Sequence, residues 1–384
     1  MEQWKEYKLG EILTIKYGKD HKRIVDGNIP IYGSGGIMRY GERSIYDGPS
    51  ILIPRKGSLN NVMFVDKPFW TVDTMFWSII NEDIANPLFV YYSICKKDFA
   101  SFNVGSAVPS LTVPIIEDID ILLPSKVTQD KVVAVLKSLD DKIELNRRIN
   151  DNLEQQAQAL FKSWFVDFEP FKDGEFVDSE LGMIPKGWRV GTLSDIIHFE
   201  SGFAFKSDSF CENGQYRLIT IKGVQDGRLD INGAVCIDSL PSRMPNYCLL
   251  SEGDIIMSLT GNVGRCCIVD RQNLLLNQRV VKLRPVTRNN SLFVYSMFRR
   301  EGFKEKLISL SRGTAQANLS PIETANLKAI IPNNDTISKF SYLGEFVFSL
   351  LLNNIKETNV LVHLRDTLLP RLMSGELKIN DLNC

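Results

Sequence analysis

The sequence predicts an α+β fold in which two related mixed α/β domains are separated by two long helices that pair as an antiparallel coiled coil. Three observations lead to this prediction: an internal repeat, two helical segments with heptad spacing, and short apolar runs broken by turn residues. A length of 384 residues suits two or three domains, each large enough to form a core of its own.

The internal repeat sets the number of related domains. Trp4 corresponds to Trp188, 184 residues further along the chain. At Gly105, which corresponds to Gly313, the offset has grown to 208, as loop insertions in the second copy would make it. Solenoid repeats are about 20–50 residues long, so a repeat of roughly 200 residues indicates two domains, each followed by a spacer. The predicted boundaries are 1–125 for the first domain, 126–168 for the central long helix, 169–187 for an acidic linker, 188–332 for the second domain, and 333–384 for the C-terminal long helix and tail.

The composition is that of an ordinary water-soluble chain, with 44% hydrophobic and 24% charged residues. No apolar run approaches the ~20 residues that span a membrane, and the first residues do not resemble a signal peptide. The seven cysteines form no CxxC pair, which is typical of a reducing cytoplasm, so a cytoplasmic location is expected. The three histidines lie far apart and indicate no metal site.

Each domain shows short apolar runs broken by glycine-containing turns. Residues 51–53 and 62–65 are such runs in the first copy, and residues 255–257 form one in the second. The net charge of −1 hides a local basic excess, because residues 16–56 contain eight basic side chains and four acidic ones. Basic and amide side chains in turns suit loops that face nucleic acid, although a solvated surface with uneven charge would show the same pattern.

The two long helices are predicted from a narrow apolar stripe. From Val132 to Trp164 the stripe follows a 4-3-4-3 spacing for more than four heptads, about 48 Å at 1.5 Å per residue. A weaker copy lies 208 residues later, and Asn146 and Asn354 occupy the same position in the two stripes. An antiparallel pair would place the two domains at opposite ends of a rod; alternatively, each helix packs on its own domain. The predicted pairing residues are Val132, Leu136, Leu139, Ile143, Asn146, Leu153, Leu160, Val347, Leu351, Asn354, Leu361 and Leu368.

No motif for catalysis is present in the sequence. It contains neither GxxxxGKS/T for a nucleotide nor GxGxxG at the start of a helix, and dispersed histidines cannot form a catalytic triad. We therefore expect no catalytic residues, no metal site and no bound nucleotide or dinucleotide in this chain.

Several segments together resemble one known family. They are residues 139–146 (LDDKIELN), 160–170 (LFKSWFVDFEP), 182–188 (GMIPKGW) and 364–377 (LRDTLLPRLMSGEL), with 105–111 (GSAVPSL) and 276–280 (LNQRV) inside the domains. This order is similar to that of specificity subunits of type I restriction–modification systems. Each motif alone is short, but their joint order is specific, and the likeness extends over nearly the whole chain.

The resemblance implies a non-catalytic reader of DNA. Two target-recognition domains would each read one half of a bipartite site in double-stranded DNA. Two methyltransferase subunits would dock on the helices and restriction/translocase subunits would join them, bringing S-adenosylmethionine, ATP and Mg²⁺. Trp164, Phe165 and Phe168 are the candidates for docking a partner, or alternatively for the joint between helix and domain.

The candidate DNA contacts are the basic and amide-bearing turns at matching places in the two copies. They are Lys19, Lys22, Arg23, Ser34, Arg39, Arg55 and Asn60 in the first copy, and Lys206, Lys222, Arg228, Thr260, Asn262, Arg265 and Arg312 in the second. Two alternatives remain at the level of sequence: a scaffold that binds proteins rather than DNA, and an enzyme that fuses recognition with catalysis.

Overall fold

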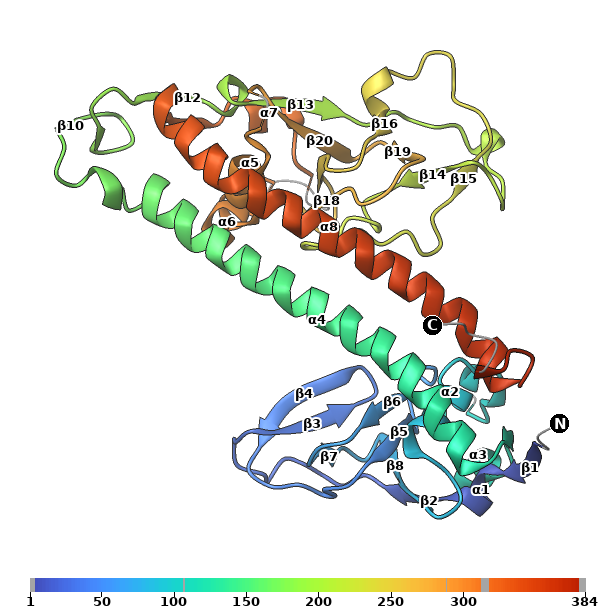
Figure 1. Ribbon diagram of the computed structural model, residues 1–384. Coiled ribbons are helices and arrows are strands. Elements are labelled where there is room, and N and C mark those ends of the chain that lie inside the picture. The colour runs from blue at the N-terminus through green and yellow to red at the C-terminus, as the bar shows by residue number, and fades with distance from the viewer. Residues whose placement is uncertain (1–3, 106–107, 288, 312–317, 380–384) are drawn as a thin grey trace. The chain divides into compact units, whose positions relative to one another are not determined.

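Two compact units make up the computed structural model, which describes residues 4–105, 108–287, 289–311 and 318–379. Unit 1 contains Met1–Lys142 and Leu361–Cys384, and unit 2 contains Ile143–Val360. Each unit therefore combines one copy of the repeat with a part of each long helix (Figure 1).

Unit 1 contains a four-stranded antiparallel sheet and a three-stranded mixed sheet. The first has the order β2 (Leu13–Tyr17), β8 (Met75–Ile80), β5 (Ser50–Pro54), β6 (Met63–Val65). The second has the order β4 (Gly36–Gly41), β3 (Ile29–Gly33), β7 (Trp70–Thr71), and its β3–β7 pair is parallel. A separate antiparallel pair joins β1 (Lys5–Lys8) to β9 (Asp120–Leu123).

Unit 2 repeats this topology with longer loops. Its antiparallel sheet has the order β13 (Ile197–Ser201), β20 (Val280–Pro285), β17 (Ile255–Ser258), β18 (Cys266–Ile268). Its mixed sheet has the order β15 (Cys236–Ile237), β14 (Tyr216–Ile219), β19 (Leu274–Leu276), β16 (Leu249–Leu250), and β14–β19 is the parallel pair. β12 (Arg189–Thr192) pairs with β21 (Lys328–Ile331), and β10 (Phe176–Val177) with β11 (Ile184–Pro185).

Short helices occupy matching places in the two units. Asn86 caps α2 by accepting hydrogen bonds from the backbone N–H groups of Leu88 and Phe89, and Pro87 takes the first helical position, where no N–H is needed. The helices of unit 1 are α1 (Leu9–Ile12), α2 (Pro87–Ile94), η1 (Phe99–Phe102) and α3 (Val113–Glu117). Those of unit 2 are η2 (Glu169–Phe171), η3 (Leu193–Asp195), η4 (Ser207–Ser209), η5 (Asn246–Cys248), α5 (Ser291–Arg299), α6 (Glu301–Leu310) and α7 (Pro321–Ala325).

One pair of repeated glycines has a steric explanation. A Cβ atom on Gly18 would lie 2.0 Å from the carbonyl oxygen of Val72, and one on Gly202 would lie 2.0 Å from that of Asn277. These glycines directly follow β2 and β13, and in each unit their backbone is in close contact with the backbone directly after β7 or β19. Only glycine allows this approach.

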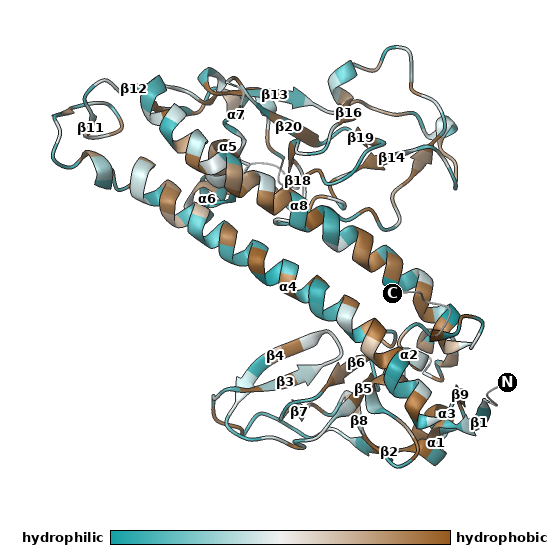
Figure 2. Ribbon diagram, in the orientation of Figure 1, coloured by the Kyte–Doolittle hydropathy of each residue, from teal (hydrophilic) through white to brown (hydrophobic). Residues whose placement is uncertain are grey.

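The long helices are α4 (Lys126–Phe165) and α8 (Asn334–Met373). In unit 2, the rings of Phe161 and Phe340 are 6.2 Å apart, and the amide of Asn354 donates to Asn150 Oδ1 at 2.9 Å. The earlier residue of α4, Asn150, contacts the later residue of α8, Asn354, and the later residue of α4, Phe161, contacts the earlier residue of α8, Phe340. The two helices therefore run antiparallel in this unit. Figure 2 shows hydrophobic residues recurring along both helices between hydrophilic ones.

Unit 1 contains the start of α4 and the end of α8. Leu136 and Leu372 are completely buried in the same core cluster, and Arg365 Nη1 donates to Asp140 Oδ1 at 2.8 Å. The α+β class with an antiparallel helix pair is thereby confirmed. All the residues of the predicted stripes are buried or half-buried: Val132, Leu136, Leu139, Ile143, Asn146, Leu153, Leu160, Val347, Leu351, Asn354, Leu361 and Leu368.

Candidate nucleic-acid interface

Backbone hydrogen bonds gather separate loops of unit 1 beside the end of β5. The Arg55 N–H donates to the carbonyl of Thr74, and the Arg55 carbonyl accepts from the N–H of Leu111, both at 2.9 Å. Two residues after Arg55, the Gly57 N–H donates to the Pro109 carbonyl at 3.2 Å. Three segments distant in sequence therefore form one polar surface.

Unit 2 builds the same surface from the equivalent residues. The Leu259 N–H donates to the Arg279 carbonyl at 2.9 Å, and the Leu259 carbonyl accepts from the N–H of Leu319 at 2.8 Å. The bridge between Thr260 and Asn318 matches that between Lys56 and Ser110 in unit 1. The turn glycines, Gly57 and Gly261, also share positive φ angles of 88° and 72°.

The predicted DNA-contact residues of unit 1 fall into two groups. Lys19, Lys22 and Arg23 are exposed, and no ion pair involves their side chains within the described part of the chain. Ser34 lies in the turn of the β3–β4 hairpin, where its carbonyl accepts from Asn61 Nδ2 at 2.8 Å.

The other three predicted residues of unit 1 make structural contacts. Arg39 turns its guanidinium toward the carbonyl of Ile24 and toward Asp26, 3.8 Å away. Arg55 Nη1 donates to the carbonyl of Asp73 at 3.3 Å, with the guanidinium 5.4 Å from the centre of the Tyr17 ring.

Asn60 uses both ends of its amide within unit 1. Its Nδ2 donates to Asp98 Oδ1 at 3.0 Å, and its Oδ1 accepts from the Ala100 N–H at 2.9 Å. This side chain therefore fixes the 98–100 turn.

In unit 2, Lys206, Lys222, Arg228 and Asn262 are exposed, whereas Thr260 and Arg265 are half-buried. Thr260 Oγ1 donates to Asn318 Oδ1 at 3.0 Å, and Arg265 Nη1 donates to Gln225 Oε1 at 2.5 Å. Arg312 lies outside the described residues.

Sequence reasoning missed two residues of this surface, Arg279 and Asn318. Arg279 is exposed, has a φ of 69°, and donates from Nη1 to Asn318 Oδ1 at 3.3 Å. The LNQRV motif that carried part of the family resemblance contains Arg279, so that motif could have placed it among the candidates. Asn318 stands at the position of Ser110, which the repeat alone could have indicated.

In each unit a tyrosine, a carboxylate of α4 and an arginine form a clamp that joins α4 to neighbouring helices, which are α2 and α8 in unit 1 and α5 in unit 2. In unit 1, Tyr92 Oη donates to Asp140 Oδ2 at 2.6 Å, and Arg365 pairs with the same carboxylate at 2.8 Å. Burial, together with the Asp140 hydrogen bond, raises the pKa of Tyr92, so this hydroxyl remains a proton donor.

In unit 2, the Tyr295 hydroxyl donates to Glu154, and Arg299 Nη2 pairs with Glu154 at 2.8 Å. Burial, together with the charge of Glu154, raises the pKa of Tyr295.

The predicted docking aromatics belong to a cluster within unit 2. The ring of Phe165 lies 4.8 Å from Phe293 and 4.9 Å from Phe340. Trp164 lies 5.8 Å from Phe340, and Phe168 lies 5.6 Å from Trp188. These contacts join the end of α4 to the second domain, and a docking role for the three side chains stays a prediction.

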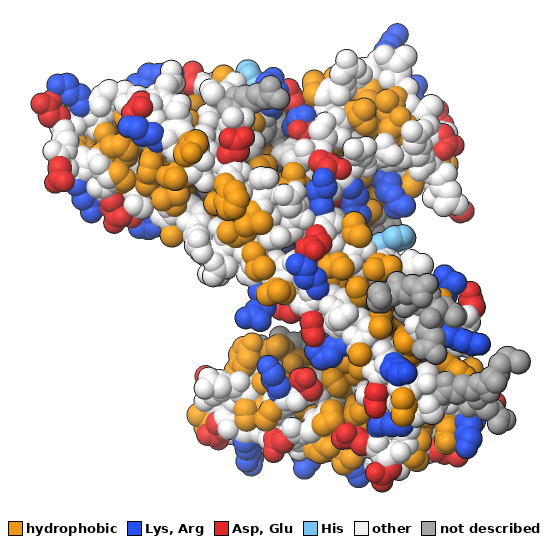
Figure 3. Space-filling model, viewed as in Figure 1, with side chains coloured by type: hydrophobic (Ala, Val, Ile, Leu, Met, Phe, Trp, Pro, Cys, Tyr) orange, Lys and Arg blue, Asp and Glu red, His pale blue; other side chains and the backbone are white. Residues whose placement is uncertain are grey.

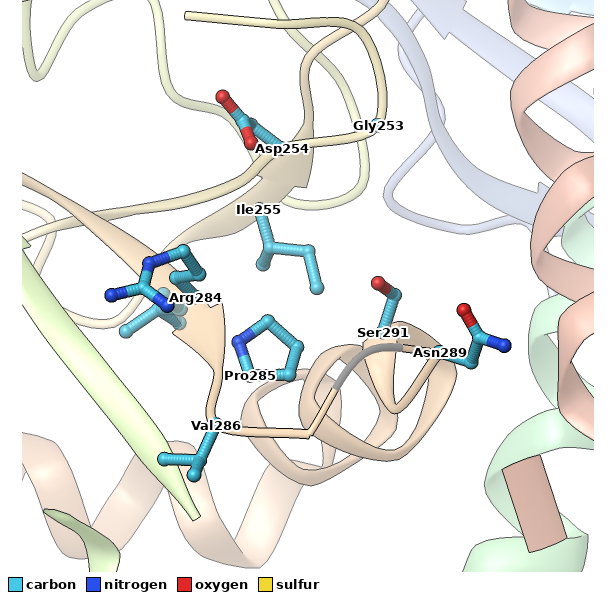
Figure 4. Close-up of a pocket in the computed structure, with 9 residues that line it drawn as sticks. Gly253, Asp254, Ile255, Arg284, Pro285, Val286, Asn289 and Ser291 are labelled. Atoms are coloured by element: carbon cyan, nitrogen blue, oxygen red, sulfur yellow. The ribbon is translucent and has the colours of Figure 1, made fainter. Parts of the chain in front are cut away.

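A shallow pocket of about 300 Å³ opens beside the start of β17 and the end of β20 (Figure 4). Asp254, Arg284, Asn289 and Ser291 are its polar lining residues. Asp254 is already paired with Lys282 at 2.9 Å, and no cysteine or histidine lines the pocket. Its side chains form no nucleophile–base arrangement.

The family model for the type I restriction modification DNA specificity domain matches residues 1–155 and 185–360. The chain belongs to the family of type I DNA specificity subunits. The specificity subunit of the type I restriction enzyme MjaIX, from Methanocaldococcus jannaschii, is 31% identical in an alignment that covers 88% of this chain and 80% of that protein. The HindI specificity subunit from Haemophilus influenzae is 23% identical in an alignment that covers 98% of this chain and all of that protein.

The crystal structure of a type I specificity subunit from M. genitalium has the same fold. It matches with a TM-score of 0.60 and 17% identity over 97% of this chain and 96% of that chain. As a member of this family, the specificity subunit described here is non-catalytic and recognises DNA targets, which confirms the function predicted from the sequence.

Two negative findings concern only the described residues. None of their helices has the length and apolar character needed to cross a membrane. Within the same ranges, no group of three or more His, Cys, Asp and Glu side chains is placed to hold a metal ion.

Proposed function

We propose that this specificity subunit reads a bipartite site in double-stranded DNA, one half with each unit. The observation that carries the proposal is the equivalent loop surface in the two units, built by matching hydrogen bonds around Arg55 and Leu259. Exposed lysines and arginines near these loops would contact phosphates, whereas side chains reaching base edges would select the sequence.

The proposed complex contains two methyltransferase subunits and restriction/translocase subunits. S-adenosylmethionine, ATP and Mg²⁺ would bind those partners, while this chain would bind no cofactor and supply the choice of DNA site. Because its substrate is the DNA of the cell, the complex would act in the cytoplasm.

An exposed apolar face on α8 suits the docking of a methyltransferase subunit. Tyr342 and Phe346 are 83% and 73% exposed, and they lie four residues apart on one side of the helix. Large apolar side chains this exposed are typical of protein interfaces. At the equivalent positions of α4, 208 residues earlier, stand the small residues Ala134 and Ser138. We therefore add the α8 face to the docking candidates.

Methylome sequencing tests the DNA-reading proposal most directly. Cells that carry this gene and its partner genes should show one bipartite methylated motif, which disappears when this gene alone is deleted. A methylome that is unchanged by the deletion would contradict the proposal.

Filter binding separates a DNA reader from a protein scaffold. Affinity for mixed duplexes should fall steeply between low and moderate salt, because phosphate contacts release counterions. Absent or salt-independent binding would favour the scaffold.

A further inference from the structure

We propose that the β3–β4 hairpin of unit 1 enters a groove of the DNA and that the apolar side chains of Ile37, Met38 and Tyr40 contact bases there. These three residues would then determine part of the first half-site. The inference rests on the proposed DNA-reading function and adds the residues and the type of contact.

The first support is exposure on an edge strand. Ile37, Met38 and Tyr40 are 49%, 58% and 51% exposed, and β4 is the edge strand of the β4-β3-β7 sheet. Exposed apolar edge strands favour aggregation, and proteins usually protect them with charges or covering segments. Three exposed apolar residues within the six-residue edge strand β4 therefore indicate a binding surface.

The pairing of the hairpin places Arg39 and Tyr40 on opposite faces of the sheet. Ile31 is completely buried and pairs with Arg39, whereas Pro30 pairs with Tyr40. Residues opposite one another share a face of the sheet, so Arg39 lies on the inner face with Ile31 and Tyr40 on the outer one. The contact of Arg39 with the Ile24 carbonyl ties the inner face to the 19–26 loop.

Positive charges beside the hairpin favour DNA over a protein partner. Lys19, Lys22 and Arg23 are exposed on the loop that is bonded to β4 through Arg39. Asp20 on the same loop accepts from the Lys22 backbone N–H at 3.1 Å, and this hydrogen bond lowers the pKa of its carboxyl group. One charged carboxylate on this loop thus lies among three cations. Figure 3 shows basic and hydrophobic side chains next to one another on the visible face of this unit.

The geometry of the hairpin suits the major groove. A groove about 12 Å wide admits a two-stranded ribbon, and apolar side chains can contact the thymine methyl group within it. The hairpin turn also belongs to the loop surface described above, because Asn61 binds the carbonyl of Ser34. The cations would then position the hairpin on phosphates, while the apolar side chains distinguish bases.

Among the described residues of unit 2, the equivalent pair of strands, β14 and β15, has no exposed apolar side chain of this kind. In its β14–β15 pair, Leu218, Ile219, Cys236 and Ile237 are all buried. Apolar reading by a hairpin is therefore expected in only one of the two half-sites.

The test selects duplexes from a pool with a randomised central segment, using the full-length chain. The variant I37S/M38S/Y40S should lose preference at one or more positions of one half-site, by at least about fivefold per position, because a wrong base pair costs about 1–3 kcal/mol. The other half-site and the slope of affinity against salt should stay unchanged, since no phosphate contact is removed. Leu122→Ser, at a 43% exposed residue on β9, is the matched control.

Three results would overturn the inference while leaving the DNA-reading function intact. They are an unchanged selected motif in the triple variant and in each single variant, an equal loss of affinity for all sequences, and a loss of partner binding without a change in sequence preference. A wild-type chain that selects no sequence would instead contradict the proposed function itself.

Discussion

Unit 1 and unit 2 repeat one topology but complete their cores with different helix ends. In unit 1 the start of α4 packs with the end of α8, where Leu369 and Leu372 are buried. In unit 2 the start of α8 packs with the end of α4, where Ala157 and Phe161 are buried. Each recognition domain therefore depends on a helix that follows the other copy in the sequence.

The largest expected effect is a change of DNA target after domain exchange. Replacing residues 188–332 with the equivalent domain of a relative should change one half-site completely and leave the other intact, because the two units have separate core clusters. Methylome sequencing of cells carrying the hybrid is the measurement. A change in both half-sites would show that the two units do not read separately.

A core substitution at the end of α8 should destabilise unit 1 rather than unit 2. Leu372 is completely buried in the core cluster of unit 1, so Leu372→Ala should cost about 2–5 kcal/mol through lost burial and a cavity. Hydrogen exchange can assign the loss to residues 4–142. Leu364→Ala, at a residue 43% exposed on the same helix, is the control and should change little. Equal loss of protection in both units would contradict the division of the cores.

Breaking the clamp of unit 2 should have a smaller effect. Glu154→Gln removes the charge that pairs with Arg299, whose side chain is only 20% exposed. Arg299 would keep Asp226, 3.3 Å away, but would lose its closer carboxylate, which should cost about 1–3 kcal/mol of unfolding free energy. Glu144→Gln, on an exposed face of the same helix, should have almost no effect in the same denaturant titration. Equal effects of the two variants would show that the clamp is dispensable.

The smallest effect is expected from alkaline pH in unit 1. Burial raises the pKa of Tyr91 to about 12, from an unfolded value near 10. The unfolded chain therefore releases this proton first, and the stability contributed by the neutral phenol declines as pH rises from about 10 to 12. Tyr91→Phe should reduce the slope of stability against pH in that window. An unchanged slope in the variant would show that Tyr91 does not titrate as proposed.

The repeat predicted the number of domains because matching residues recur along the chain, and the heptad stripes predicted the helix pair because they depend on periodic burial. The apolar residues of the stripe, among them Leu136 and Ile143, are buried or half-buried along α4. An average spacing of 3.5 residues keeps such side chains on one face of a helix. What the sequence could not show is which helix end completes which core. That choice depends on long-range contacts such as Phe161 with Phe340, which leave no local pattern.

The candidate interface was harder to predict residue by residue. Turn composition pointed to the loops around Arg55 and Thr260, which hydrogen bonds do gather into one surface in each unit. Composition could not distinguish an exposed lysine such as Lys22 from Asn60, whose amide is used inside the unit. It also overlooked the apolar residues of β4, because hydrophobic residues in a strand are normally predicted to be buried.

The shared helix ends have a consequence for how new specificities can arise. A recognition domain imported from another subunit arrives without the segment that fills its core, and Phe293 of the present domain rests on Phe161 and Phe165 of α4. An imported domain must therefore pack against the helices α4 and α8 of the recipient chain. Recombination can exchange the loops that read DNA, but only between domains whose packing surface is complementary to these helices.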